Sequence, residues 1–441
     1  MGLNHTPWTL LLGLTLASGC GSDSARTEAP ATGTTAPIRT DAPLIPAGLT
    51  RAQYHDKVLG LLVGSAMGDA MGAPTEMWSR ADIQTEYGHV TGLDSMVRSP
   101  SGEGTWRYNL PAGGTTDDTR WKQLAAQFVL SQDWNRPDPR AFARFLEKQY
   151  GAQIDGLRNT EGYDADAFDE AALRVGWLQE WARVARPYAD RDFDGYHDAL
   201  SRFYGGEPTC AGLLYGPLLG VCAPANPARG YDFGYRLSLF DLGYARDLTA
   251  LSAAFTAAAF TPGATPETLL GTVRDVDPRG YYRSRLVGRT AYRLLRQARG
   301  IAAESQGLTR ADVPPGFRVP PAFRQRLDTL GYLRLQRAYE RLDALNQDLP
   351  FHPGECFLIA VTAMLHSEFD YERTMAFIVN YGRDNDTVAA IAGAWLGAYH
   401  GAARLPQAEV ARVVRVNREQ LGIDLPRLAE QLTAKLYGPK P

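Results

Sequence analysis

Small residues repeated at four-residue spacing constrain the fold of this 441-residue chain more than any other feature. In one apolar segment every fourth residue from position 60 to position 72 is glycine, and Gly393 and Gly397 repeat the spacing in a second segment. Four residues make about one helical turn, and glycine costs a helix up to about 1 kcal/mol relative to alanine. We therefore expect two helices whose smooth faces allow close approach. Membrane helices pack in this way, but Asp69 and the short apolar runs argue against a membrane location.

The chain after residue 50 is predicted to be helical throughout. Thr50 and Gln53 form a capping-box pair before the first glycine segment. Apolar residues recur with a helical period over 51–71, 117–131, 139–149, 165–185, 245–260, 281–303, 323–347, 354–368, 371–381, 386–401 and 406–417. The longest irregular stretches are 88–116, 151–164, 205–232 and 306–322. No strand-like pair is joined by a tight turn, so the sequence predicts an all-α fold.

Composition excludes several classes of protein. The 46 Lys and Arg against 49 Asp and Glu give a net charge of −3, which argues against a nucleic-acid partner. The seven His form no close pair, and the four Cys form no C-x-x-C pair, so a zinc site of the common kinds is not predicted. Cys210 and Cys222 could pair, or the three cysteines after Cys20 could all be buried thiols.

The N-terminus is predicted to be a targeting segment. Trp8 to Ala17 is an apolar run that suits a signal peptide but is too short to span a bilayer. The sequence Ala17-Ser18-Gly19-Cys20 resembles a bacterial lipoprotein box, so we expect a signal peptide over 1–20 and lipid attachment at Cys20. A plain secretory signal cleaved near Ala17 is the alternative. Residues 21–47 are expected to be a disordered tether and 48–441 the folded domain. The protein is then exported, and touches a membrane through its lipid only.

Two acidic motifs each stand at the start of a predicted helix. The first is Thr116-Asp117-Asp118-Thr119 and the second is Asp384-Asn385-Asp386-Thr387. Either motif alone is explained by helix capping. One helix start needs only one cap, however, and four carboxylates in one place would repel without a counter-ion. Ligands that are all oxygen select Mg²⁺, Ca²⁺ or Mn²⁺.

A third element ends the first glycine segment. It runs from Gly68-Asp69 through a proline-bearing turn to Glu76. A lone glutamate in a loop is usually solvated. The alternative is that the turn directs the Glu76 carboxylate toward the metal ligands.

Together the three motifs resemble the ADP-ribosylglycohydrolase family, including its dinitrogenase-reductase-activating members. The family pattern combines a GD-x-x-G-x-x-x-E segment, T-D-D-T, and G-x-D-x-D-T before a helix of small residues, in the order found here. The resemblance implies a compact multi-helix orthogonal bundle with two Mg²⁺ (or Mn²⁺) ions in a cleft.

It also implies hydrolysis of the glycosidic bond of ADP-ribose, carried by a protein or a small conjugate. The implied metal ligands are Thr116, Asp117, Asp118, Asp384, Asp386 and Thr387. The implied catalytic residues are Glu76, Asp117 and Asp386, with Gly382 at the substrate.

Departures from the family pattern leave alternatives open. The mid-chain segment from Cys210 to Pro217 lacks the Asn and Met-Arg of many members, and Tyr381 stands where a second glycine is frequent. Residues 262–350 carry no assignable motif. A non-catalytic, metal-stabilised lipoprotein that binds a nucleotide-like ligand or a protein partner is the main alternative. A haloacid-dehalogenase-type phosphatase would need an apolar strand before Asp384, and none is present in the sequence.

Overall fold

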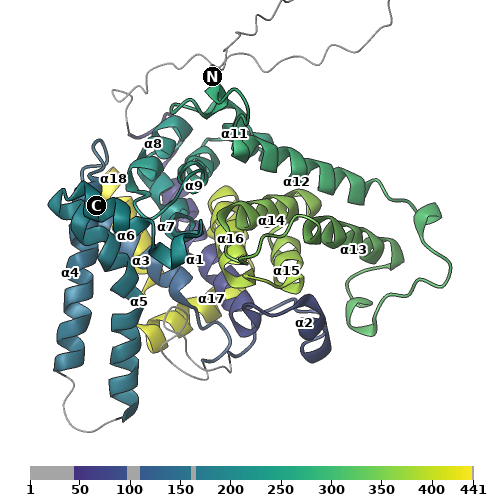
Figure 1. Ribbon diagram of the computed structural model, residues 1–441. Coiled ribbons are helices and arrows are strands. Elements are labelled where there is room, and N and C mark those ends of the chain that lie inside the picture. Colours follow the sequence, from purple (N-terminus) through teal and green to yellow (C-terminus); the bar gives the residue numbers. More distant parts are fainter. Residues whose placement is uncertain (1–43, 97–109, 160–164, 440–441) are drawn as a thin grey trace, which may run out of the picture. The chain divides into compact units, whose positions relative to one another are not determined.

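A computed structural model describes residues 44–96, 110–159 and 165–439, all of which lie in one compact unit. The described residues are built from helices (Figure 1). The only β-type pairing among them is an isolated antiparallel bridge between Met96 and Leu110. The predicted all-α fold is therefore confirmed. The predicted signal peptide, Cys20 and most of the predicted tether lie outside the described residues.

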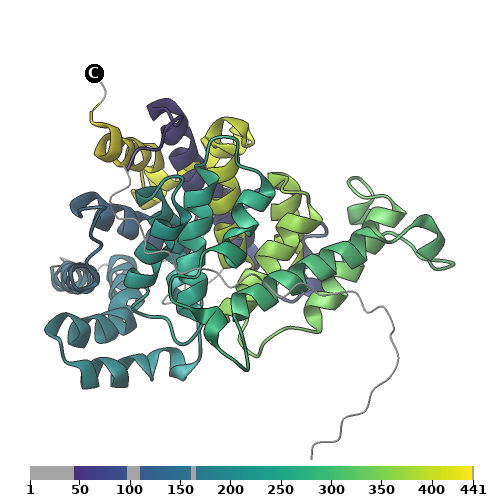
Figure 2. The same cartoon turned by 90° about the horizontal axis from the view of Figure 1, so that it is seen from above.

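The two glycine segments form helices α1 (Arg51–Gly72) and α16 (Asn385–His400), which pack against each other (Figures 1 and 2). They run in opposite directions, since Gly60 faces Gly397 and Gly64 faces Gly393. A Cβ atom added to Gly60 would lie 2.2 Å from the carbonyl oxygen of Gly397, and one added to Gly64 would lie 2.5 Å from that of Gly393. Side chains at these positions would therefore collide with the facing backbone. The predicted close approach is confirmed, and it explains the four-residue spacing.

Most predicted helices are present. They are α3 (Asp117–Ser131), α4 (Pro139–Arg158), α5 (Ala165–Asp190), α9 (Ala245–Ala259), α12 (Thr290–Gln306), α13 (Thr329–Asp343), α14 (Pro353–His366), α15 (Tyr371–Tyr381) and α17 (Gln407–Val416). Of these, α4 ends nine residues later, α12 begins nine residues later and α13 begins six residues later than predicted. The predicted capping box of Thr50 and Gln53 is also present. Helix α10 (Pro266–Leu270) begins where a capping threonine followed by proline, Thr265-Pro266, predicts a helix start.

Several helices were not predicted. They are α2 (Arg80–Glu86), α6 (Phe193–Leu200), α7 (Ala211–Leu219), α8 (Pro227–Leu237), α11 (Thr272–Asp275) and α18 (Leu425–Tyr437). The prediction of an irregular stretch over 205–232 was therefore wrong. Every residue of α7 is buried, so its sequence has no alternation between apolar and polar faces to reveal a helix. The prediction of an irregular stretch over 151–164 was also partly wrong, because α4 continues to Arg158.

An ion pair joins residues 262–350, the segment in which the sequence shows no assignable motif, to the core. The guanidinium of Arg289, just before α12, donates to both carboxylate oxygens of Asp247 on α9, at 2.7 and 2.9 Å. Tyr231 donates to the same carboxylate at 2.6 Å. All three side chains are buried, so the pair is fully desolvated and its hydrogen bonds are satisfied. Among the described helices, none is both long and apolar enough to cross a membrane.

Candidate metal centre

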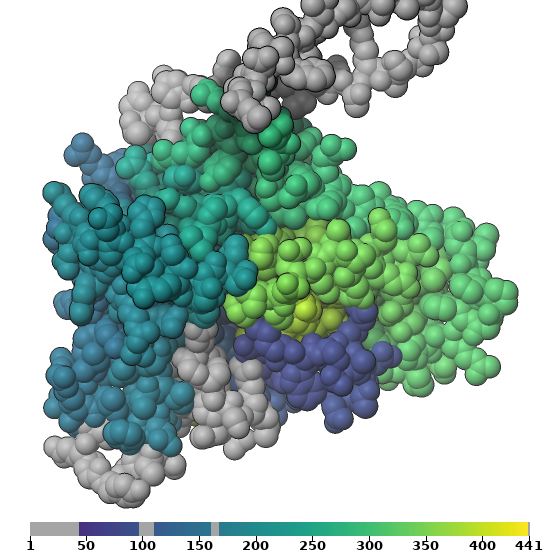
Figure 3. Space-filling view, in the orientation of Figure 1, coloured from purple at the N-terminus to yellow at the C-terminus, as the bar shows by residue number. Residues whose placement is uncertain are grey.

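The antiparallel packing of α1 and α16 brings the end of one helix to the start of the other. Gly72, the last residue of α1, faces Asp386 so closely that an added Cβ would lie 2.4 Å from the Asp386 Cα. A short 3₁₀ turn, Ala73–Thr75, then leads to Glu76. In the space-filling view the segment after α1, in purple, lies against the yellow-green segment of α14 to α16 (Figure 3).

Backbone hydrogen bonds join the loop that follows Glu76 to the loop that precedes α16. The amide of Met77 donates to the carbonyl of Arg383 at 2.8 Å, and the amide of Arg383 donates to the carbonyl of Trp78 at 3.0 Å. Gly382 has a φ of +85°, and a Cβ there would lie 2.6 Å from the Trp78 carbonyl oxygen. Glycine is thus required at this position for backbone conformation and contact. Its predicted contact with substrate stays a prediction.

Three carboxylates converge at this junction. One oxygen from each of Glu76, Asp384 and Asp386 lies within 4.8 Å of the others. Asp384 and Asp386 are buried and Glu76 is half-buried. Among the described residues, Oδ2 of Asp384 and Oδ1 of Asp386 have no hydrogen-bond partner. Buried, crowded oxygens of this kind fit a hard divalent cation such as Mg²⁺ or Mn²⁺.

The electrostatics of the three carboxylates support the same interpretation. Burial, and then the negative charge of Glu76, raises the pKa of Asp384 and of Asp386 well above its usual value. Repulsion from neighbouring acids therefore acts in the same direction as burial. Although Asp384 is the N-cap residue of α16, its side chain makes no capping hydrogen bond. Helix capping thus does not explain this acid.

The first acidic motif meets the second through side-chain contacts. Oγ1 of Thr116, the N-cap residue of α3, lies 3.3 Å from Asp386 Oδ2, although its one proton has the nearer acceptor in Asp69, at 2.9 Å. Thr387 donates from Oγ1 to Asp118 Oδ2 at 2.9 Å. The other Asp118 oxygen, Oδ1, accepts from Lys122 Nζ at 3.0 Å, and both side chains of this ion pair are 1% exposed. The two motifs, about 270 residues apart, therefore form one site.

Asp69 is a site residue to which the sequence analysis gave no role. Its carboxylate accepts four hydrogen bonds, from the backbone amides and hydroxyls of Thr116 and Thr119, at 2.5 to 3.0 Å. Burial, followed by the charge of Asp118, raises the pKa of Asp69 to about 6. The carboxylate therefore positions the first turn of α3. An acid inside an apolar, glycine-rich helix was the available signal.

Lys122 is the second residue that the sequence analysis missed. The signal was its position four residues after Asp118, which places both on one face of α3. Asp117, the other predicted ligand of this motif, is half-buried at the first position of the helix. Its charge acts on the buried Arg120, whose pKa burial lowers to about 10. The assignment of Asp117 as a ligand and catalytic residue stays a prediction.

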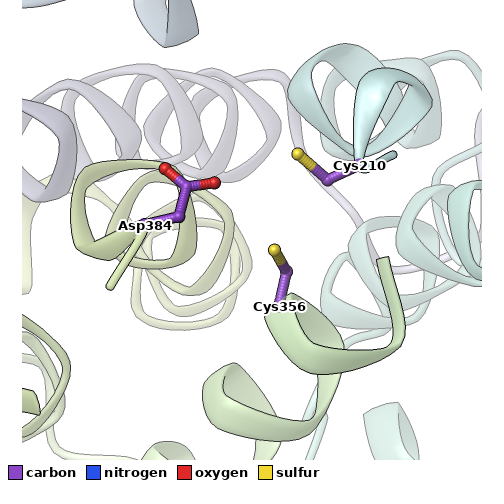
Figure 4. A group of neighbouring side chains, drawn as sticks. All are labelled: Cys210, Cys356 and Asp384. Atoms are coloured by element: carbon purple, nitrogen blue, oxygen red, sulfur yellow. The ribbon is translucent and has the colours of Figure 1, made fainter. Parts of the chain in front are cut away.

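Two thiols lie beside the three carboxylates. One ligand atom from each of Cys210, Cys356 and Asp384 lies within 4.8 Å of the others, and the side chains face a common space (Figure 4). Cys210, Cys222 and Cys356 are all free and buried. Of the two possibilities left open by the sequence, three buried thiols is therefore the one observed.

Comparison with known proteins agrees with the geometry. A sequence profile described as ADP-ribosylglycohydrolase matches residues 50–441. The chain is 30% identical over 89 residues to "Uncharacterized protein YegU" of Escherichia coli (strain K12), a match that covers 20% of this chain and 25% of that protein. A solved chain named "ADP-ribosylglycohydrolase-related protein complex" has a similar fold, with a TM-score of 0.52 and 20% identity. That similarity covers 87% of this chain and 99% of the solved one.

Proposed function

Because the chain belongs to the ADP-ribosylglycohydrolase family, we propose that it hydrolyses the glycosidic bond between ADP-ribose and an acceptor with the aid of Mg²⁺ or Mn²⁺. The observation that carries the proposal is the convergence of Glu76, Asp384 and Asp386, in which two buried oxygens lack a partner among the described residues. The acceptor is a protein or a small conjugate.

The proposed chemistry follows from the arrangement of the acids. A bound hard cation supplies positive charge that orients a water molecule and the hydroxyls of the ribose. Cleavage at an anomeric carbon passes through an oxocarbenium-like transition state, which nearby carboxylates stabilise. Glu76 is more exposed than Asp384 and Asp386, so it is the acid best placed to exchange a proton with substrate or solvent. The hydroxyl of Thr387 holds Asp118 in position, and the hydroxyl of Thr116 contacts Asp386.

The number of ions depends on Asp118. The sequence predicts two, but both Asp118 oxygens already accept hydrogen bonds, from Lys122 and Thr387. The three carboxylates of Glu76, Asp384 and Asp386 suffice for one ion. We propose that the Lys122 ammonium group neutralises Asp118 and that one divalent cation binds per chain.

The test is release of free ADP-ribose from a panel of ADP-ribosyl conjugates, with Mg²⁺, with Mn²⁺ or with a chelator. We expect release with metal and none with chelator. Asp386→Asn should abolish it, whereas Asp198→Asn, on an exposed side chain that pairs with Arg202, should leave it unchanged. Binding of ADP-ribose without release from any conjugate would instead favour the non-catalytic alternative.

We also propose that the protein is exported and anchored by a lipid at Cys20. The support is the apolar run from Trp8 to Ala17, the small residues before Cys20 and the polar composition of residues 21–43. Cys20→Ser should move the protein from the membrane fraction to the soluble fraction or leave an unprocessed precursor. Unchanged membrane partitioning with normal processing would contradict the proposal.

A further inference from the structure

The two thiols beside the carboxylates come from separate parts of the chain. Cys210 is the N-cap residue of α7, Cys356 lies in the first turns of α14, and Asp384 is the N-cap residue of α16. All three are buried. Their side chains converge on one space (Figure 4), with one ligand atom from each within 4.8 Å of the others.

The backbone around the thiols is held by contacts that do not involve sulfur. The amide of Cys210 donates to the carbonyl of Phe351 at 2.9 Å, which joins the start of α7 to the segment that leads into α14. Next to Cys356, the buried Glu355 accepts two hydrogen bonds from the Arg383 guanidinium, at 2.7 and 2.9 Å. Arg383 precedes Asp384 directly, so this pair fixes α14 against the start of α16.

We propose that Cys210, Cys356 and Asp384 form a binding site for a thiophilic divalent cation of the Zn²⁺ class, which competes with the hard cation for Asp384. Sulfur ligands select soft and borderline metals, whereas oxygen ligands alone select hard ones. Three protein ligands with a fourth position open form a common type of zinc site. The Asp384 oxygen without a hydrogen-bond partner is available to either ion.

Cation binding at this site exchanges protons for metal. The hydrogen bond with Cys356, and then burial, raise the pKa of Cys210. The same hydrogen bond lowers the pKa of Cys356, but burial and nearby negative charges outweigh it and raise that pKa as well. Both groups are therefore thiols when no cation is bound. On binding, two S–H bonds break, two metal–sulfur bonds and one metal–oxygen bond form, and two protons leave to solvent.

The consequence is inhibition by a soft cation. Asp384 belongs to both ligand sets, the one with Glu76 and Asp386 and the one with Cys210 and Cys356. An ion held by the two sulfurs therefore removes one carboxylate from the hard-cation site. This competition rests on the proposed function, whereas the binding itself does not.

Co²⁺ provides a direct probe of the binding, because thiolate coordination gives it a charge-transfer absorption in the near ultraviolet. The full chain carrying Cys20→Ser retains three cysteines, at positions 210, 222 and 356. We expect one equivalent of Co²⁺ to produce the band under anaerobic conditions, Zn²⁺ to remove it and excess Mg²⁺ to leave it. Cys210→Ala and Cys356→Ala should each lose the band.

Cys222→Ala is the matched control, since Cys222 is also free and buried but belongs to no group of metal-ligating side chains among the described residues. It should keep the full band. The absence of the band in the parent chain, or its loss in Cys222→Ala as in Cys210→Ala, would overturn the proposal. So would a thiol count of one instead of three in the denatured protein, because Cys210 and Cys356 would then form a disulfide.

A second measurement tests the competition. Zn²⁺ should displace bound Mn²⁺, detected by electron paramagnetic resonance of the released ion, from the parent chain and from Cys222→Ala. In Cys210→Ala the Zn²⁺ concentration needed to displace Mn²⁺ should rise by more than roughly 100-fold. Loss of an outer-shell partner alone costs a metal site about 10- to 100-fold in affinity, and Cys210 is a direct ligand. Equal displacement in all three proteins would refute the competition. A cobalt band without ADP-ribose release from any conjugate would refute the proposed function while leaving the thiol site in place.

Discussion

The three carboxylates at the junction of α1 and α16 differ in burial, and this difference predicts different effects on substitution. Asp384→Asn and Asp386→Asn each remove a buried ligand with an oxygen that has no partner among the described residues. We expect Mn²⁺ affinity and ADP-ribose release to fall together, by at least about 100-fold.

Glu76→Gln should reduce release as strongly but Mn²⁺ affinity less, because Glu76 is half-buried. Titration calorimetry with Mn²⁺ and the release assay separate the two effects. Equal loss of affinity in Glu76→Gln and Asp386→Asn would refute this division of roles.

The proposal that Lys122 determines how many ions the site holds can be tested by substitution. The Lys122 ammonium group contacts Asp118 at 3.0 Å in an ion pair that is almost fully buried. Removal of one partner from such a pair destabilises a protein by about 3–5 kcal/mol, because the other charge is left unpaired. In Lys122→Met we therefore expect a lower melting temperature without metal and partial rescue by Mn²⁺.

The Mn²⁺ stoichiometry should rise from one per parent chain to two per Lys122→Met chain, measured on gel-filtered protein by elemental analysis. Lys148→Met, on a largely solvent-facing position of α4, is the control and should bind one ion. Two ions in the parent chain would show that Lys122 does not replace a cation.

At the scale of single residues, the sequence predicts site residues that belong to a recognisable motif and misses those that belong to none. Asp118, Asp384 and Asp386 were predicted because each belongs to a spaced motif. Lys122 was missed, since an isolated lysine in a helix is usually solvated. Only its burial against Asp118 reveals its charge as part of the site. The two thiols were missed for a related reason, because residues 146 positions apart give no local signal that they meet.

Helices α1 and α16 carry two of the three motifs, and their separation sets the geometry of the site. A Cβ at Gly397 would lie 1.9 Å from the Gly60 carbonyl oxygen, and one at Gly64 would lie 2.5 Å from that of Gly393. Gly397→Ala should therefore push the helices apart and destabilise the fold by about 1–3 kcal/mol, as overpacking does. The affinity for Mn²⁺ should fall as well, because the separation of α1 and α16 places Glu76 relative to Asp384 and Asp386.

Gly300→Ala is the matched control, because Gly300 lies inside α12 and a Cβ there has no atom within 4 Å. It should stabilise the protein by up to about 1 kcal/mol, since alanine favours a helix more than glycine does. Urea unfolding measures both variants. A similar gain in stability for Gly397→Ala would show that the close approach is not required.

Exposure of one helix face explains only part of the success of helix prediction, because α9 was predicted although almost all of it is buried, and α18 was missed although one of its faces is exposed. Helix α12 alternates between buried and exposed residues, and it was predicted from that period. Helix α7 is buried throughout, so it was interpreted as an irregular stretch. The helices of the two glycine segments were predicted for a different reason. Glycines spaced four residues apart indicate contact with a neighbouring backbone, so the spacing predicts both a helix and its packing.

At the scale of the whole molecule, the half-buried His366 makes stability depend on pH. Burial, with the positive charges of Arg334 and Arg373, lowers the pKa of His366 to about 4. The folded protein then holds a neutral imidazole between pH 6.5 and 4, whereas the unfolded chain takes up a proton. This contribution to stability is complete above pH 6.5 and is lost as the pH falls toward 4, by about 1–3 kcal/mol.

His366→Gln should reduce the loss of stability between pH 7.5 and pH 4.5, as measured by urea unfolding at both values. Ser305, whose hydroxyl lies 3.1 Å from the His366 ring nitrogen, can hydrogen-bond to the glutamine as well. His197→Gln, at an exposed position, provides the comparison. An unchanged pH dependence in His366→Gln would exclude this imidazole as a cause of acid sensitivity.

The hard cation should couple segments that are far apart in the chain, because its ligands follow α1 and begin α16. Without metal, the buried carboxylates repel, so Asp386→Asn should raise the melting temperature in chelator. With saturating Mg²⁺ the parent chain gains about 2.7 kcal/mol when the ion is at 100 times its dissociation constant. The variant, which has lost a ligand, gains much less. The order of the two melting temperatures should therefore invert between chelator and Mg²⁺, and Asp198→Asn should match the parent chain in both. If Asp386→Asn were less stable by the same amount in both conditions, the acid would act as a helix-terminal charge and not as a ligand.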